Sequence, residues 1–257
     1  MSALTLQPRR IWLLMRNDVS VARTPAIMLA AASGATLILY VLTAWGAGSP
    51  TFHEVVYPIL LVVLGYILSS FAFSDIHDPR TGAYALTAPG STLEKYVAKV
   101  LLTSVGWAIA VTLVYMATTA LGAGLARLIF GHSHGIFVPR GRGMWELIAG
   151  YLVSQSIFVL GSVYFKKAAF LKTVLAATVI GIIFAVFFTF AFRVIYWGEF
   201  SRFWPSEAEM NAVARAAQPV IEWFARVGTR ITDIARWTVV PIFFWVAGYV
   251  RLRETEV

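Results

Sequence analysis

Four histidines are the most versatile chemical groups in this chain, and two local patterns around them resemble functional motifs. His53 and Glu54 begin like the metalloprotease motif H-E-x-x-H, but position 57 is Tyr57, so the second zinc ligand is missing. His132 and His134 flank a serine in a Gly-rich segment and could bind a metal, although two loop histidines are more often ordinary loop residues. The chain has no cysteine, which excludes disulfides, iron–sulfur clusters, zinc–thiolate sites and a cysteine nucleophile.

Catalytic groups are scarce in the apolar parts of the sequence. The first five apolar segments contain no Asp or Glu, which argues against an intramembrane aspartyl protease, and no His, which argues against a rhomboid-like Ser–His protease. No G-x-x-x-x-G-K-[ST] motif occurs, so the chain has no phosphate-binding loop of its own. We therefore expect no catalytic residue, no cofactor and no metal site in this chain, and we expect that it is not an enzyme.

The composition predicts a membrane protein. Apolar residues make up 59% of the 257 positions, and charged residues only 13%. Soluble domains carry about 25% charged residues, and a soluble globule of this size cannot bury so much apolar surface. The net charge of +8 is typical of basic residues that flank membrane spans, and we expect no nucleic acid as a partner.

Six apolar segments are long enough to cross the hydrocarbon core as helices, which takes about 20 residues. They lie at residues 26–45, 55–73, 100–121, 147–164, 173–192 and 231–250. The sixth is the weakest, and it is long enough only if its helix starts near Ile231 and Arg236 reaches the interface. Since no alternating strand pattern appears, the predicted fold is all-α: a polytopic membrane protein with a single transmembrane domain over residues 1–257 and six transmembrane helices.

Two further segments have amphipathic helical patterns. In residues 1–24, apolar side chains recur between arginines at helical spacing, which predicts an N-terminal interfacial amphipathic helix; a basic tail is the alternative. Between spans five and six, apolar residues step by three or four through the 193–230 segment, which predicts an external amphipathic helix bent at Pro219. This helix could lie on the membrane surface or pack over the spans.

Lys and Arg residues predict the orientation of the chain. They occur in residues 1–24, in the short links after the second and fourth spans, and in the C-terminal tail, whereas the link after the first span has none. Basic residues in short links mark the cytoplasmic side of a membrane. We therefore expect both termini to be cytoplasmic.

The 74–99 link is predicted to form an ordered cytoplasmic element. An Asp-Pro pair and a Pro-Gly pair interrupt it, and between them lies a short helix near 82–88. Ser91-x-x-Glu94 is a capping box, which predicts that a helix starts near Thr92 and continues into the third span. Such an element could dock a peripheral protein, and an ordinary loop with one capped helix is the alternative.

Four uncharged polar residues within the spans form a candidate substrate path: Ser69, Ser70, Ser154 and Gln155. Polar side chains inside spans can line a route for cargo. The alternative is that they form hydrogen bonds between closely packed helices.

The layout and several strings resemble a known family. Six spans after an interfacial helix, a cytoplasmic segment between spans two and three and an elaborated external segment between spans five and six are similar to the type-2 permeases of ATP-binding cassette exporters (ABC transporters). The strings at 74–78, 88–96 and 249–257 resemble small bacterial permeases of this kind. They cover about 25 residues and are not diagnostic signatures.

The resemblance implies a membrane-spanning permease subunit in a bacterial cytoplasmic (inner) membrane. Its implied partners are separate ATP-binding cassette ATPase subunits, a second permease copy or homologue, and membrane lipid; ATP-Mg is expected on the ATPase. The residues expected to dock the ATPase are Asp78, Arg80, Thr81, Tyr84, Leu86 and Lys95. Two other classes stay open: a lipid-active membrane enzyme or scramblase, and a structural or signalling membrane protein without transport. The cargo, its direction and the choice between homodimer and heterodimer are open as well.

Overall fold

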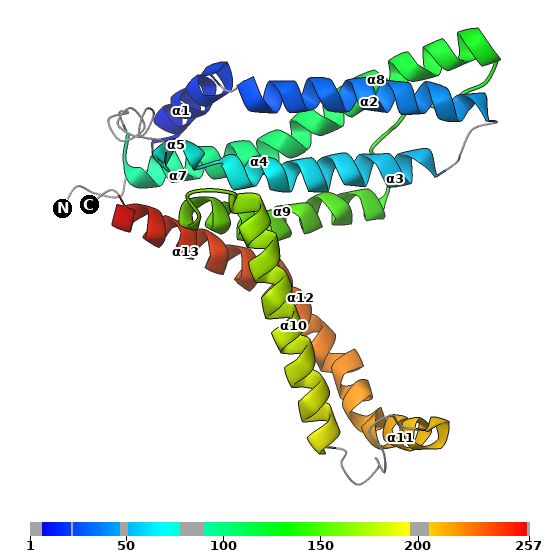
Figure 1. Cartoon of the computed structure of the whole chain (residues 1–257), viewed down its shortest axis with the longest axis vertical. Helices are drawn as coiled ribbons and strands as arrows, with labels where there is room; N and C mark the ends of the chain where they lie inside the picture. Colours follow the sequence, from blue (N-terminus) through cyan, green and yellow to red (C-terminus); the bar gives the residue numbers. More distant parts are fainter. Residues whose placement is uncertain (1–6, 22, 47–50, 78–89, 196–205, 256–257) are drawn as a thin grey trace. The chain divides into compact units, whose positions relative to one another are not determined.

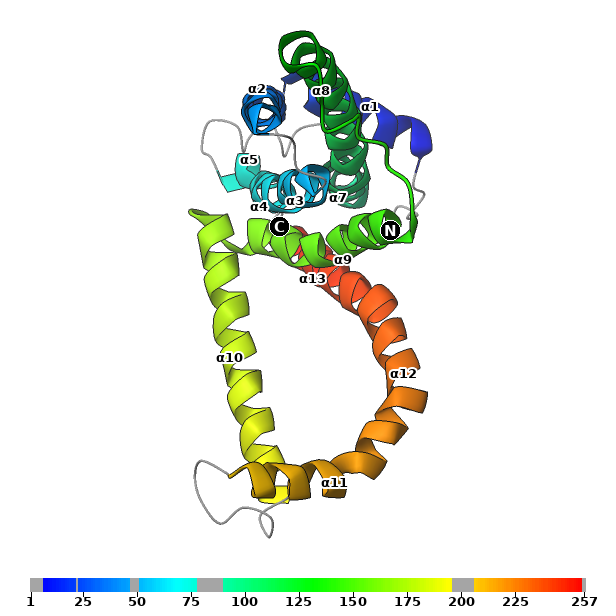
Figure 2. The same cartoon turned by 90° about the vertical axis from the view of Figure 1, so that its right-hand side faces the viewer.

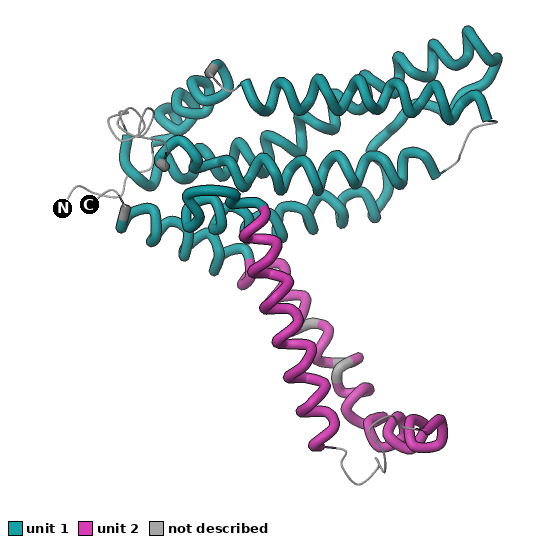
Figure 3. The backbone as a smooth tube through the Cα atoms, viewed as in Figure 1, with its two compact units in different colours: residues 1–170, 241–257 teal, residues 171–240 magenta. Residues whose placement is uncertain are grey.

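The protein is helical wherever the structure describes it. The structure is a computed structural model that describes residues 7–21, 23–46, 51–77, 90–195 and 206–255. No strand occurs in these ranges, which confirms the all-α prediction. The contacts between residues divide the chain into two compact units, one of residues 1–170 and 241–257 and one of residues 171–240 (Figure 3).

The first unit combines helices from both ends of the chain (Figure 1). Its elements are α1 (Pro8–Val21), α2 (Arg23–Trp45), α3 (Phe52–Ile59), η1 (Leu60–Leu64), α4 (Gly65–Phe71), α5 (Ser74–His77), α7 (Thr92–Leu101), η2 (Leu102–Gly106), α8 (Trp107–Phe130), α9 (Arg142–Tyr164) and most of α13 (Val240–Thr255). The η elements are π-helical turns that continue the helices on either side of them.

Six described helices are long and apolar enough to cross a membrane, at the six predicted places. They span Arg23–Trp45, Phe52–Ile76, Thr92–Phe130, Arg142–Tyr164, Ala169–Ile195 and Ile231–Glu254. The third has 39 residues, roughly 58 Å at the α-helical rise, so it exceeds a hydrocarbon core of about 30 Å. The sixth starts at Ile231, as expected, and contains Arg236, whose guanidinium lies 5.1 Å from the centroid of the Trp237 ring.

Helices of the first unit pack in pairs: α2 against α8, α4 against α9, and α1 against α7 (Figures 1 and 2). Close approach in the first pair depends on Gly122, because a Cβ at this position would lie 2.9 Å from the ring of Tyr40. Gly65 has the same role in the second pair, where the ring of Tyr151 covers the place that a Cβ would occupy. Small residues at these contacts let membrane helices approach closely.

The π-helical turns receive hydrogen bonds from buried aromatic side chains. The indole Nε1 of Trp107 donates to the carbonyl of Leu61 in η1, at 3.1 Å. The hydroxyl of Tyr151 donates to the carbonyl of Thr103 in η2, at 2.7 Å. Both donors are at most 2% exposed, so without these carbonyls they would lie unpaired among apolar groups.

The second unit contains most of α10 (Ala169–Ile195), together with α11 (Glu207–Trp223), η4 (Phe224–Gly228), α12 (Thr229–Ile234) and η5 (Ala235–Val239). None of the residues in the apolar window of α10 is buried within the chain. Ser206 caps α11: its Oγ accepts from the amide of Glu209, and its own amide donates to the Glu209 carboxylate at 2.7 Å. This second capping box is a feature that the sequence analysis missed.

The 193–230 segment is helical as expected where it is described, and α11 runs through Pro219. Val213 and Ala217 are buried, whereas Met210 and Val220 of the same expected apolar stripe are half exposed. The external position of this helix stays a prediction.

A substitution at Gly65 tests the packing of α4 on α9. Gly65→Ala should lower the free energy of unfolding by about 1–3 kcal/mol, because Tyr151 is held by its own hydrogen bond and cannot yield to an added methyl group. The matched control is Gly150→Ala, since a Cβ there meets nothing within 4 Å. Thermal unfolding in detergent measures both variants, and equal stability of the two would contradict this account of the packing.

Candidate functional site

The start of α7 forms the best-organised polar site of the described chain. The amide of Glu94 donates to Ser91 Oγ at 3.2 Å, and the amide of Ser91 donates to Glu94 Oε2 at 3.0 Å. This is the predicted capping box, and α7 begins at Thr92 as expected. The helix therefore has a fixed starting point directly after the 78–89 segment.

Glu94 also holds the start of α1. Its second oxygen, Oε1, accepts from the amide of Gln7 at 3.1 Å. Gln7 is the residue before α1, and its carbonyl accepts the first amide bonds of that helix. Glu94 is 1% exposed, so one buried carboxylate satisfies amides at the starts of two helices, where negative charge is favoured.

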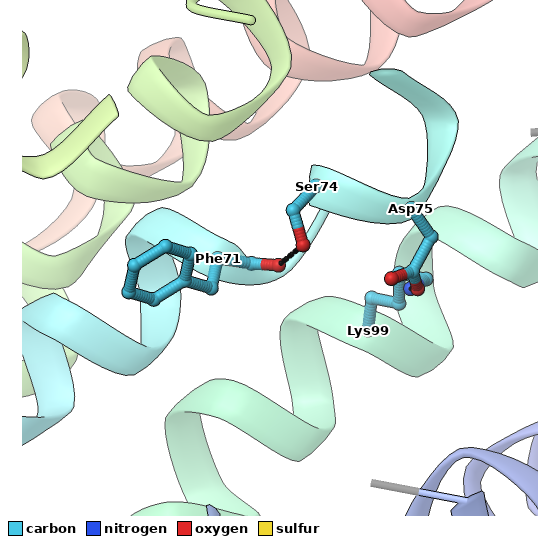
Figure 4. Close-up of polar contacts among 4 residues, drawn as sticks. All are labelled: Phe71, Ser74, Asp75 and Lys99. Atoms are coloured by element: carbon cyan, nitrogen blue, oxygen red, sulfur yellow. Dashed lines mark hydrogen bonds and ion pairs between the residues drawn. The ribbon is translucent and has the colours of Figure 1, made fainter. Parts of the chain in front are cut away.

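A charged cluster lies one helical turn further along α7 (Figure 4). Lys99 Nζ lies 2.8 Å from Asp75 Oδ2 of α5 and 5.8 Å from the centroid of the Phe73 ring. Asp18 of α1 belongs to the same cluster, because its charge interacts with both Lys99 and Asp75. Burial raises the pKa of the Asp18 carboxyl above its ordinary value; the Lys99 ammonium opposes the rise and the Asp75 carboxylate adds to it.

Two contacts join α5, which ends just before residue 78, to its neighbours. The hydroxyl of Ser74 donates to the Phe71 carbonyl at 2.8 Å and closes the turn between α4 and α5 (Figure 4). Asp75 is then joined to α7 through Lys99. The two helices that flank residues 78–89 in the sequence, α5 and α7, are thus connected to each other by an ion pair.

Most of the predicted docking residues lie in this segment, outside the described residues: Asp78, Arg80, Thr81, Tyr84 and Leu86. The short helix expected at 82–88 lies there as well. Lys95 is described, and it is half-buried on α7 beside Glu94. Sequence reasoning missed the roles of Gln7, Asp18, Asp75 and Lys99, because each depends on a partner that is distant in the sequence.

An apolar cluster supports this end of the unit. Phe73, Tyr96, Val159 and Leu252 belong to it, and they bring together the turn between α4 and α5, α7, α9 and α13. Gly248 of α13 lets Tyr96 of α7 approach closely, because a Cβ at position 248 would lie 2.6 Å from the Tyr96 hydroxyl. The charged residues therefore lie next to a closely packed apolar cluster.

The candidate path residues come together between α4 and α9. Ser69 Oγ donates to Gln155 Oε1 at 3.1 Å, and both residues are fully buried. Tyr66 donates to Ser154 Oγ at 2.6 Å, and Ser70 donates to the main chain of its own helix. The bonds of Ser69 and Tyr66 join α4 to α9, as the alternative interpretation expects, and the substrate path stays a prediction. Among these groups, the Gln155 Nε2 atom is buried without a partner.

Three histidines tie the 131–141 connection to its neighbours. His53 contacts the Tyr115 hydroxyl at 3.1 Å and the carbonyl in the connection at position 135 at 3.3 Å. His132 Nε2 donates to the Ala44 carbonyl at 2.6 Å, and His134 contacts Thr43 Oγ1 at 2.8 Å. No group of three or more His, Cys, Asp or Glu residues suited to a metal occurs among the described residues.

Comparison with known proteins assigns no family to this chain, so the fold alone indicates the class of protein. No protein-family model, no curated protein and no solved structure matches this chain. The described helices make it an all-α membrane protein with six candidate spans.

Asp18→Asn tests the charged cluster. Because the folded state holds the Asp18 proton more tightly than the unfolded state, wild-type stability falls as pH rises through the raised pKa. Asparagine lacks this proton, so the stability of the variant relative to wild type should increase from about pH 4 towards neutral pH. Thermal unfolding across this range measures the difference.

The control for this experiment is Asn17→Ala, at an exposed uncharged residue of the same helix. Its stability relative to the wild type should not change with pH, because the substitution alters no titratable group. A relative stability of Asp18→Asn that is also independent of pH would contradict the buried position of Asp18.

Gln155→Met tests the polar contact between α4 and α9. The change removes the unpaired Nε2 donor together with the Ser69 bond, so stability should stay within about 1 kcal/mol of the wild type. Ser69→Ala leaves both ends of Gln155 unpaired and should cost more, about 1–2 kcal/mol. Thermal unfolding gives the order of the three proteins, and a Gln155→Met variant less stable than Ser69→Ala would refute the assignment.

Proposed function

We propose that this chain is the membrane-spanning permease subunit of an ATP-binding cassette exporter in a bacterial inner membrane. It works as a dimer, its termini face the cytoplasm, and separate ATPase subunits dock on the 74–99 link and supply hydrolysis of ATP-Mg. The proposal rests on the resemblance in layout and on one observation. The described residues on both sides of positions 78–89 contact the same helix, α7: Asp75 pairs with Lys99, and Ser91 and Glu94 form the cap at the start of the helix.

A link attached to one helix on both sides is suited to receive force from a docked protein. Movement of a protein docked on the 74–99 link would be transmitted to α7, because the capped start of this helix lies within the link and the Asp75–Lys99 pair adds a second connection. The helix that starts there continues for 39 residues through η2 and α8. In the proposed mechanism, closure of the ATPase pair displaces this long helix, and the spans rearrange between inward-open and outward-open states.

The exposed surface of α10 supports a second permease copy. Its apolar window has no buried residue, and Ala177, Gly181 and Ala185 follow one another at four-residue spacing. Nothing lies within 4 Å of a Cβ built at Gly181. Small residues at this spacing let two membrane helices approach closely.

The decisive experiment is purification of the tagged chain from its native membranes, followed by assays for ATP hydrolysis and ATP-driven export from vesicles. An ATPase with a Walker motif should co-purify, identified by mass spectrometry. The double variant Tyr84→Ala with Leu86→Ala should lose the ATPase, since truncating apolar anchors of an interface costs on the order of 2 kcal/mol each. Arg80→Ala should weaken docking only at low salt.

The control is Ile136→Ala with Val138→Ala, because both side chains are exposed and lie in a different connection. This variant should retain the ATPase. If no ATPase co-purifies with the wild type, the exporter proposal fails. Lipid flipping by the purified chain without ATP would instead favour the scramblase.

A further inference from the structure

Helix α1 has two faces of different chemistry. Gln7, Ile11, Leu14 and Asp18 share one face, which packs towards α7: Leu14 Cδ1 lies 3.4 Å from a Cβ built at Gly90, and Gln7 is bonded to Glu94. Ile11, Leu14 and Asp18 are half-buried. Ile11 and Leu14 of the apolar stripe expected to lie on the membrane are therefore partly covered within the protein.

The opposite face of α1 is exposed and carries only positive charge. At 100° per residue, Arg9 and Arg16 lie at its centre, two turns apart, and Trp12 and Leu13 lie between them. Trp12 is 63% exposed and Leu13 51% exposed. The single acid of α1, Asp18, is on the other face with Lys99. We call Arg9, Trp12, Leu13 and Arg16 the basic face.

The position of α1 places the basic face close to a membrane surface. Residue 22 alone separates α1 from α2, and α2 is a candidate membrane span from its first residue. Figure 1 shows α1 at the end of the first unit where α5 and α7 also lie. A short helix next to the entry of a span lies at the level of the lipid headgroups.

We propose that the basic face binds the anionic headgroups of the membrane surface. Arg9 and Arg16 would contact lipid phosphates, and Trp12 and Leu13 would enter the boundary between headgroups and acyl chains, where Trp is favoured. Charge complementarity identifies the partner, because arginines with an apolar edge and no acid match an anionic surface. This inference does not depend on the transport function.

An environment-sensitive fluorophore on residue 13 tests the proposal. The chain has no native cysteine, so Leu13→Cys can be labelled at one site with a nitrobenzoxadiazole dye. The labelled full chain is reconstituted in nanodiscs of phosphatidylcholine, with or without phosphatidylglycerol. Emission should move to shorter wavelength when phosphatidylglycerol is present. Salt should reverse about half of this shift or more at 1 M, where the screening length falls to about 3 Å.

Charge variants give the second arm. Arg9→Gln with Arg16→Gln should abolish the difference between the two lipid compositions. Arg140→Gln with Arg142→Gln removes the same charge from the 131–141 connection and the start of α9, and should leave the difference intact. The proposal is overturned by equal, salt-independent emission in both lipids, which indicates an apolar anchor, and equally by water-like emission in both, which indicates a face open to solvent or to a protein partner.

Discussion

A polar donor buried inside a membrane bundle is costly unless it finds an acceptor, and the packing of the first unit depends on this requirement. Trp107 and Tyr151 bring an N–H and an O–H into the apolar interior, and each reaches a main-chain carbonyl of a π-helical turn. A donor left unpaired there would cost several kcal/mol. Gly65 completes the arrangement, since only a residue without a Cβ lets the Tyr151 ring pass close enough to its acceptor. The π-turns and the glycine are therefore parts of one hydrogen-bonded contact between helices.

The same requirement organises the polar end of the unit, where Glu94 meets amides from the starts of two helices. The S-x-x-E pattern that begins α7 recurs at Ser206 and Glu209, at the start of α11. At α7 the surroundings add a second role, because the amide of Gln7, the residue before α1, donates to the other carboxylate oxygen of Glu94. A local motif thus fixes where a helix begins, while its tertiary partner decides whether it also joins two helices.

Features that depend on local sequence could be predicted, and features that depend on distant partners could not. Apolar runs identified the six spans, and the capping box identified the start of α7, because both signals lie within one helix. The Lys99–Asp75 pair joins residues that are 24 positions apart, and the Gln7–Glu94 bond joins residues 87 apart. The sequence places Lys99 only among the basic residues of the link after the second span, which gives no indication of its partner. Ser69 and Gln155 were identified as polar residues of the spans, but only the structure shows which atoms meet and which donor remains unpaired.

The links between the helix pairs differ in strength along the bundle. The consecutive helices α1 and α2 lie along the consecutive helices α7 and α8, because α1 packs on α7 and α2 packs on α8. In the middle of the bundle, the buried hydrogen bonds of Trp107 and Tyr151 connect this group to the helix that contains η1 and α4, and to α9. At the end of the unit the polar link is the Lys99–Asp75 pair, and the Asp75 side chain is 53% exposed. An ion pair with such exposure contributes about 1 kcal/mol or less, because water competes for both charges. The Lys99–Asp75 pair is therefore a weaker polar link between helices than the buried bonds of Trp107 and Tyr151, and separating α5 from α7 costs less than separating the helices that those bonds join.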